Sequence, residues 1–142
     1  MPCINRINHP LKTQLEFKSE VFPPLPGEEE KINPGRFGKN LADFLAAELP
    51  KHGFKVSLID FEDWGLRIEL ENDAFPLWIG CGNYDDEVNG FYCFIEPAKP
   101  VIRKWFAKID TTTLVARLAT ALQSILLDSG KVSNFRWVAD DN

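Results

Sequence analysis

The stretch FKVSLIDFEDWGLRIELENDAFPLWIGCGNYDDEVNGFYCFIE, residues 54–96, contains the clearest secondary-structure signal in the chain. Apolar and polar residues alternate over 54–58 and again over 66–71, which is typical of strands with one face on a core and one in water. Two later segments, 76–82 and 90–96, are apolar on both faces. The pattern therefore predicts a meander of four antiparallel strands.

The last two strands of this meander predict a register. A symmetric hairpin centred on Glu87 places Cys81 opposite Cys93 and Gly80 opposite Phe94. The second pair is physically sensible, because a large ring can cover a glycine that has no side chain of its own. In this register the two cysteines are buried as small hydrophobic residues rather than joined as a disulfide.

The same alternation directs Trp78, Tyr92 and Phe94 to the other, outer face of the sheet. Such a face is covered by the N-terminal segment, or it is an exposed apolar patch that takes a partner. A homodimer formed through these three residues is one possible outcome.

The segments before the meander predict one strand and one helix. Leu15 and Phe17 alternate with charged residues in a strand that begins at Gln14, and Glu28–Lys31 is expected to be a solvated loop. Asn33 and Pro34 then suit the N-cap and first position of a helix, whose apolar stripe ends near Gly53.

After the meander the pattern predicts two helices and a closing strand. Apolar residues at 101, 102, 105, 106 and 109 have helical spacing, and the polar run 110–113 can cap a second helix that Gly130 ends. Residues 132–138 are predicted to form a strand.

The order β-α-ββββ-α-α-β predicts a single α+β domain over 1–142, with an antiparallel sheet and helices packed on one face. Residues 1–13 are expected to form a loose lead-in and 139–142 a polar tail.

Composition limits the function classes. The 142 residues are 44% hydrophobic and 26% charged, which excludes wholesale disorder, and the net charge of −5 argues against nucleic acid as a partner. Cys3, Cys81 and Cys93 are an odd number without framework spacing, which indicates free thiols. No apolar run has the length of a signal peptide or a membrane span, so we expect a cytoplasmic protein without a membrane partner.

No residue pattern predicts a cofactor or a metal. Cys81 lies between two glycines and is one candidate nucleophile, but His9 and His52 are in no recognisable pairing with it. Glycines on either side of a strand residue also serve as close-packing sites. Cys81 and Cys93 are too far apart in sequence for a chelating knuckle, and no histidine cluster completes a zinc site.

Two turns of the meander combine carboxylates with aromatic rings. Alternate connections of a meander lie at the same end of the sheet, so the 61–65 turn and the 82–90 loop are expected to be neighbours. Aromatic residues within a charged rim are the composition of a protein-binding hot spot. The predicted partner-binding residues are Glu62, Asp63, Trp64, Tyr84, Asp85, Asp86 and Glu87.

A resemblance to a known family depends on three motifs: NPGRFG at 33–38, EDWG at 62–65 and GCGNY at 80–84. On these residues the chain resembles a family of small bacterial proteins without an established activity, so the resemblance implies no catalytic residues. In size and acidity it is also similar to bacterial immunity proteins. The expected function is a non-enzymatic protein-binding domain, an immunity-type inhibitor that occludes a basic toxin partner. The alternative is a small-molecule enzyme or sensor that uses Cys81 in a glycine-lined pocket.

Overall fold

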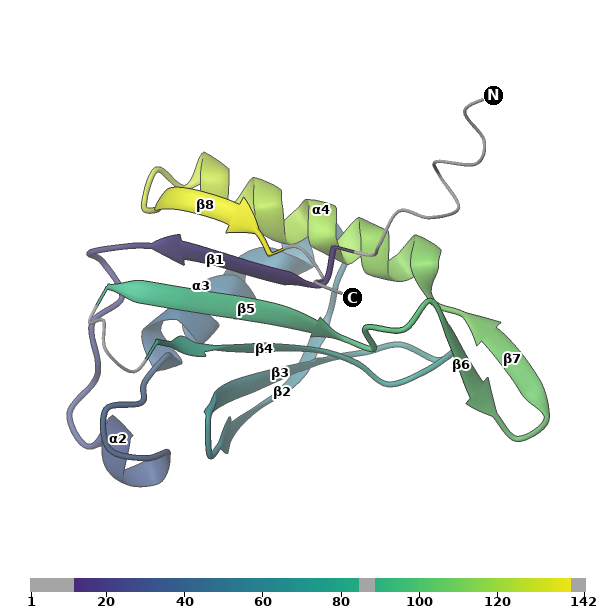
Figure 1. Cartoon of the computed structure of the whole chain (residues 1–142), viewed down its shortest axis with the longest axis horizontal. Helices are drawn as coiled ribbons and strands as arrows, with labels where there is room; N and C mark the ends of the chain where they lie inside the picture. The colour runs from purple at the N-terminus through teal and green to yellow at the C-terminus, as the bar shows by residue number, and fades with distance from the viewer. Residues whose placement is uncertain (1–11, 85–88, 139–142) are drawn as a thin grey trace.

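Six strands form one antiparallel sheet, and the two long helices cover one of its faces (Figure 1). The computed structural model describes residues 12–84 and 89–138. The sheet has the order β2-β3-β4-β5-β1-β8, and its strands are β1 (Gln14–Lys18), β2 (Val56–Glu62), β3 (Gly65–Leu70), β4 (Leu77–Asn83), β5 (Gly90–Glu96) and β8 (Ser133–Trp137). A separate two-stranded sheet is made by β6 (Val101–Lys104) and β7 (Ala107–Asp110). The helical segments are α2 (Glu28–Lys31), α3 (Lys39–Glu48), its 3-10 extension η1 (Leu49–His52) and α4 (Thr112–Asp128). The predicted α+β class and antiparallel sheet are confirmed.

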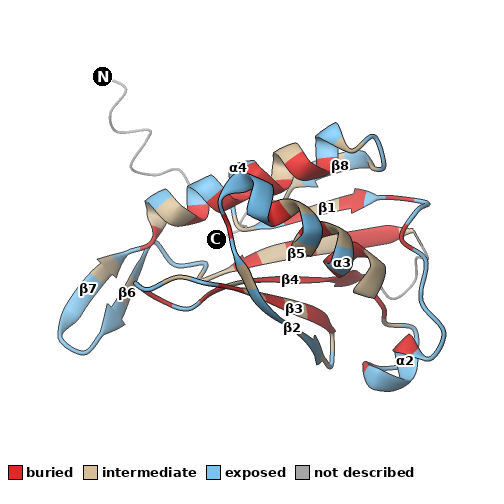
Figure 2. Ribbon diagram, turned by 180° about the vertical axis from the view of Figure 1, so that it is seen from behind, coloured by how far each residue is buried: buried red, intermediate tan, exposed pale blue. Residues whose placement is uncertain are grey.

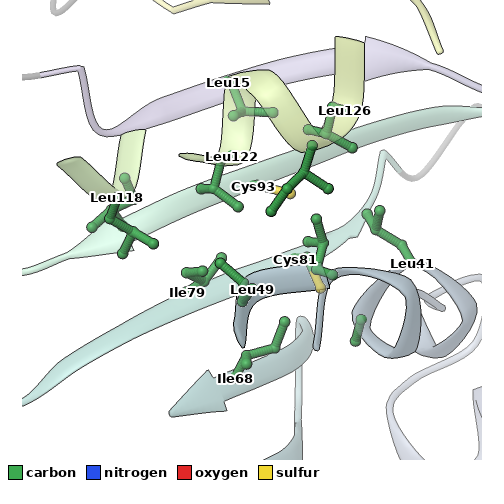
Figure 3. Close-up of a cluster of buried hydrophobic side chains, with 14 of the residues drawn as sticks. Leu15, Leu41, Leu49, Ile68, Ile79, Cys81, Cys93, Leu118, Leu122 and Leu126 are labelled. Atoms are coloured by element: carbon green, nitrogen blue, oxygen red, sulfur yellow. The ribbon is translucent and has the colours of Figure 1, made fainter. Parts of the chain in front are cut away.

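The hydrophobic core lies between the sheet and the two long helices. Alternation along the strands puts one set of side chains on this inner face, and the burial pattern follows it (Figure 2). Figure 3 shows the two layers meeting: Leu118, Leu122 and Leu126 of α4 and Leu41 of α3 approach Leu15, Ile68, Ile79, Cys81 and Cys93 of the sheet.

The register predicted for the β4–β5 hairpin is confirmed. Gly80 lies opposite Phe94, and Cys81 lies opposite Cys93. The strand β1 pairs with β5 on one side and with β8 on the other, so residues 14–18 lie within the sheet and not over it.

The helix predicted over residues 101–109 is wrong, because this segment is the β6–β7 hairpin. Ile102 and Ile109 lie opposite each other and pack against the core, so their seven-residue spacing fits a hairpin as well as two helical turns. Trp105 and Phe106, which complete the helical stripe, are instead the turn. The element order of the described residues is therefore β-α-α-ββββ-ββ-α-β, with one long helix, α4, after the meander.

The start of the first long helix also differs from the prediction. Asn33 donates its side-chain N–H to the carbonyl of Asp63, and α3 begins at Lys39. The cap comes from Glu28, which was expected to be solvated and is buried in α2: its carboxylate accepts the N–H groups of Gly38 and Lys39. A cap that lies eleven residues before the first residue of the helix has no local sequence signature.

Within the described residues, no helix has both the length and the apolar composition that crossing a membrane requires.

Candidate binding face

The outer face of the sheet carries a continuous row of five aromatic rings, which we call the aromatic face. Neighbouring rings have centroids 5.1–6.2 Å apart, in stacked, tilted or edge-on contact. Alternation along β4 and β5 directs three of these side chains outward, and the turn between β2 and β3 and the residue after β4 add the other two. The members are Trp64, Trp78, Tyr84, Tyr92 and Phe94.

Two glycines of β4 form the floor beneath these rings. A Cβ atom on Gly80 would lie 2.3 Å from Cζ of Phe94 and 2.8 Å from the ring of Trp64. A Cβ on Gly82 would lie 2.9 Å from the hydroxyl of Tyr92. The rings therefore lie directly on the backbone of β4, which only glycine allows.

No described helix covers the aromatic face, because α3 and α4 both lie on the opposite side of the sheet (Figures 1 and 2). Its five residues are half-buried, largely by one another. A half-exposed cluster of this size is the kind of apolar surface that marks an interaction site.

The charge around the aromatic face is mostly negative. The register places acidic side chains beside the rings on the outer side, or in the adjoining turn: Glu16, Asp60, Glu62, Asp63, Glu69 and Glu96. Among the strand residues, the register places the basic side chains Lys18, Arg67 and Arg136 on that side. One of them, Arg67, lies with its guanidinium 4.5 Å above the ring of Trp78 and pairs with Glu69 at 3.1 Å. The side chains that the register places around this face therefore carry a net negative charge.

A polar network closes the aromatic face at the Tyr84 end. Glu16 accepts hydrogen bonds from the hydroxyl of Tyr84 and from Nε of Arg136, and the three line a cavity of about 380 Å³. The Tyr84 hydrogen bond is the main cause that lowers the pKa of Glu16, with a smaller contribution from Arg136. Burial and the Glu16 carboxylate raise the pKa of Tyr84. These groups hold Tyr84 protonated and in place.

The three sequence motifs meet beside this face in a backbone junction. Asn83 accepts the N–H of Phe37 and donates to the carbonyl of Gly35, which ties 33–38 to β4. A Cβ on Gly65 would lie 2.3 Å from the carbonyl oxygen of Cys81, so the 62–65 turn also packs directly on β4. The motif residues at this junction therefore have a structural role in aligning the loops.

The described residues among the predicted binding set are brought together at one end of the sheet. Tyr92 links them, since its hydroxyl donates to the carbonyl of Trp64 and its ring contacts Tyr84. Glu62 is half-buried and Asp63 is exposed in the same turn. Asp85, Asp86 and Glu87 lie outside the described residues.

Cys81 is on the opposite side of the sheet from this face. It is fully buried under the helices, and burial raises the pKa of its thiol well above the usual range. Cys93 is equally buried. A nucleophile must be reachable and must ionise, and Cys81 is placed for neither. Among residues 12–84 and 89–138, no group of three or more His, Cys, Asp and Glu side chains is arranged to hold a metal ion.

Sequence reasoning missed two features of the outer side. The Glu16–Tyr84 contact joins residues 68 positions apart, and no local pattern announces it. The helical spacing places Trp105 and Phe106 in an apolar stripe, but they form the exposed tip of a hairpin, and Arg103 and Lys104 fit the solvent side of either structure.

Comparison of the chain with protein-family models, with curated proteins and with solved structures finds no match.

Proposed function

We propose that this chain is a non-enzymatic protein-binding domain that covers a basic surface of another protein with its aromatic face. The observation that carries the proposal is the row of five half-exposed rings on the side of the sheet that the described helices leave open. Large aromatic residues surrounded by a polar rim supply most of the binding energy in many interfaces.

The charge of the rim supports a basic partner. Carboxylates beside the rings would attract a positive surface, speed its association and disfavour acidic competitors. We propose that the partner is a toxin domain with a basic active surface. The chain would then act as its inhibitor in the bacterial cytoplasm, an immunity-type role that its small size and net charge of −5 favour.

Charge reversal at the rim tests this proposal. The wild-type chain is used to isolate its partner from the native host, and affinity is then measured for the Glu62→Lys/Asp63→Lys variant. We expect the partner to be basic and its affinity to fall by about tenfold or more, because both reversals repel it. The matched control is Asp73→Lys/Asp128→Lys, which makes the same charge change at exposed positions away from the aromatic face.

Two results would contradict the proposal. Equal loss of affinity in both double variants would mean that only net charge matters, and unchanged affinity in the rim variant would remove this surface from binding. Co-expression with the isolated partner tests the inhibitor role separately: wild type should restore growth, and the rim variant should restore less.

A further inference from the structure

The β6–β7 hairpin projects away from the six-stranded sheet (Figure 1). Its turn carries two exposed aromatic side chains. Trp105 is 88% exposed and Phe106 is 100% exposed. The base of the hairpin is held firmly, because buried Thr111 donates its N–H to the carbonyl of Pro100 and its hydroxyl to that of Lys99. The tip is therefore a protrusion on a fixed support.

The two rings do not serve the turn that carries them. Lys104 pairs with Ala107, so Trp105 and Phe106 form a two-residue turn, and Trp105 has a φ of 59°. Glycine or asparagine normally occupies such a position, and a bulky residue there is strained. Neither the conformation of the turn nor burial in the core explains two large aromatic residues at these positions. Their presence therefore indicates a role in binding something outside the fold.

Unpaired positive charge surrounds the tip. Arg103 lies directly opposite Lys108, a cross-strand pair of like charges that destabilises a hairpin, and Lys104 adjoins them. None of the three forms an ion pair with any other residue that the structure describes. The acidic neighbour Asp110 is engaged by the N–H and hydroxyl of Thr112. This basic cluster stands out in a chain of net charge −5 and favours an anionic ligand.

We propose that this hairpin tip docks on an anionic lipid bilayer. Trp105 and Phe106 would enter the interfacial layer, where aromatic rings partition favourably, and Arg103, Lys104 and Lys108 would contact lipid phosphates. Such docking lies on the membrane surface and needs no spanning segment. This proposal differs from the expectation of no membrane partner, because that expectation was based on the length of apolar runs and not on surface docking.

A bilayer suits this tip better than a pocket on an acidic protein. Protein hot spots are ringed by neighbouring contacts that exclude water. Here the two rings stand at the end of a two-residue turn, and its flanking residues, Lys104 and Ala107, offer little further apolar area to a protein pocket. A bilayer interface surrounds an inserted ring on all sides without such neighbouring contacts. The negative remainder of the molecule would be repelled by anionic lipid, which orients the hairpin toward it.

Vesicle cosedimentation of the full chain tests the proposal. Vesicles of phosphatidylcholine with about one third phosphatidylglycerol are compared with pure phosphatidylcholine vesicles at low salt. We expect binding to the anionic vesicles only. The Arg103→Gln/Lys108→Gln variant should bind roughly 25-fold more weakly, since each basic residue near an anionic surface contributes about fivefold.

A tip variant tests the rings separately. Trp105→Gly/Phe106→Ser should lower vesicle binding by about tenfold or more while leaving the fold intact, because the rings bury nothing and glycine suits the turn. Trp105→Phe should keep binding but lose the vesicle-induced blue shift of tryptophan fluorescence. The matched controls are Leu58→Ser/Leu127→Ser, which removes two exposed apolar residues elsewhere, and Lys51→Gln/Lys55→Gln, which removes two exposed charges. Both should bind as wild type does.

Three results would overturn the membrane proposal. The first is a wild-type chain that sediments with neither kind of vesicle. The second is a tip variant that binds anionic vesicles as strongly as wild type does. Retention of the chain on immobilised polyglutamate through Arg103 and Lys108, without vesicle binding, would assign the tip to an acidic protein instead. None of these results bears on the aromatic face, which the rim variants test independently.

Discussion

At the scale of single residues, Glu28 shows how one buried carboxylate can organise a distant helix. It accepts the N–H groups of Leu25, Gly38 and Lys39, and so joins the loop before α2 to the first turn of α3. A negative charge at a helix start also interacts favourably with the helix dipole. The α3 helix in turn packs on β3 and β4, so this one side chain affects the support beneath the aromatic face.

Replacing Glu28 therefore gives a first prediction. Glu28→Ala should lower the free energy of unfolding by about 2 kcal/mol or more, because buried N–H groups lose their acceptor. Urea unfolding monitored by circular dichroism measures the change. Glu30→Ala, an exposed neighbour in the same helix, is the control and should stay within about 0.5 kcal/mol of wild type. Equal effects of the two variants would show that Glu28 has no special role.

Glu16 and Tyr84 give a prediction about pH. A carboxyl whose pKa is lowered in the folded state adds stability that is complete above its unfolded pKa, about 4.3. This stability is lost as the pH falls through the lower, folded pKa. Tyr84→Phe removes the largest cause of the lowering. The difference in unfolding free energy between pH 7 and pH 2.5 should therefore be smaller in this variant than in wild type.

Urea titrations at several pH values check this expectation. Tyr92→Phe is the matched control, because the Tyr92 hydroxyl donates to the Trp64 carbonyl, which does not titrate. Its stability should fall with acid as much as that of wild type. A Tyr84→Phe profile parallel to the wild-type profile would mean that the hydrogen bond to Glu16 contributes nothing.

At the scale of elements, the β4–β5 pair depends on the absence of a side chain at Gly80. Gly80→Ala should lower the free energy of unfolding by about 1–3 kcal/mol, because the new methyl group meets the rings of Phe94 and Trp64. Thermal and urea unfolding measure it. In the double variant Gly80→Ala/Phe94→Leu the smaller side chain makes room, so its cost should be less than the sum of the single costs. Additive costs would place the strain elsewhere.

The β6–β7 turn gives a prediction of the opposite sign. Trp105→Gly should leave the melting temperature unchanged or raise it, because glycine relieves the left-handed backbone and the exposed ring buries little. Phe106→Gly is the control. Phe106 does not have a positive φ, so glycine there relieves no strain and only adds conformational freedom to the unfolded chain, which should lower stability slightly. A clear loss of stability in Trp105→Gly would mean that the tryptophan ring supports the fold.

These elements also show how far sequence reasoning reaches. The β4–β5 register was predictable because alternation and the pairing of Gly80 with Phe94 are local to one hairpin. The β6–β7 hairpin was not predictable, because the spacing of Ile102 and Ile109 fits both a helix and a hairpin. Only the exposure of Trp105 in the structure distinguishes the two. Among the site residues, the proximity of Trp64 and Tyr84 followed from meander geometry. The network of Glu16 and the cap by Glu28 depend on tertiary contacts that no periodicity encodes.

At the scale of the whole molecule, the thiols of Cys81 and Cys93 lie in the centre of the core (Figure 3). We expect Cys81 and Cys93 to react with a thiol reagent at equal, slow rates, because either becomes accessible only when sheet and helices separate. Burial also raises the pKa of both thiols, so their thiolate fractions are small. Mass spectrometry of a time course in a Cys3→Ser background measures both rates. Rapid labelling of Cys81 alone would show a local opening and revive a chemical role for it.

The place of β1 inside the sheet has a consequence for biosynthesis. Its outer neighbour is β8, so Leu15 near the start of the chain pairs with Trp137 near the end. The ribosome must therefore release β8 before the last strand of this sheet can pair. Until then the outer edge of β1 is unpaired in addition to that of β2, and a chaperone or a second nascent chain can occupy it.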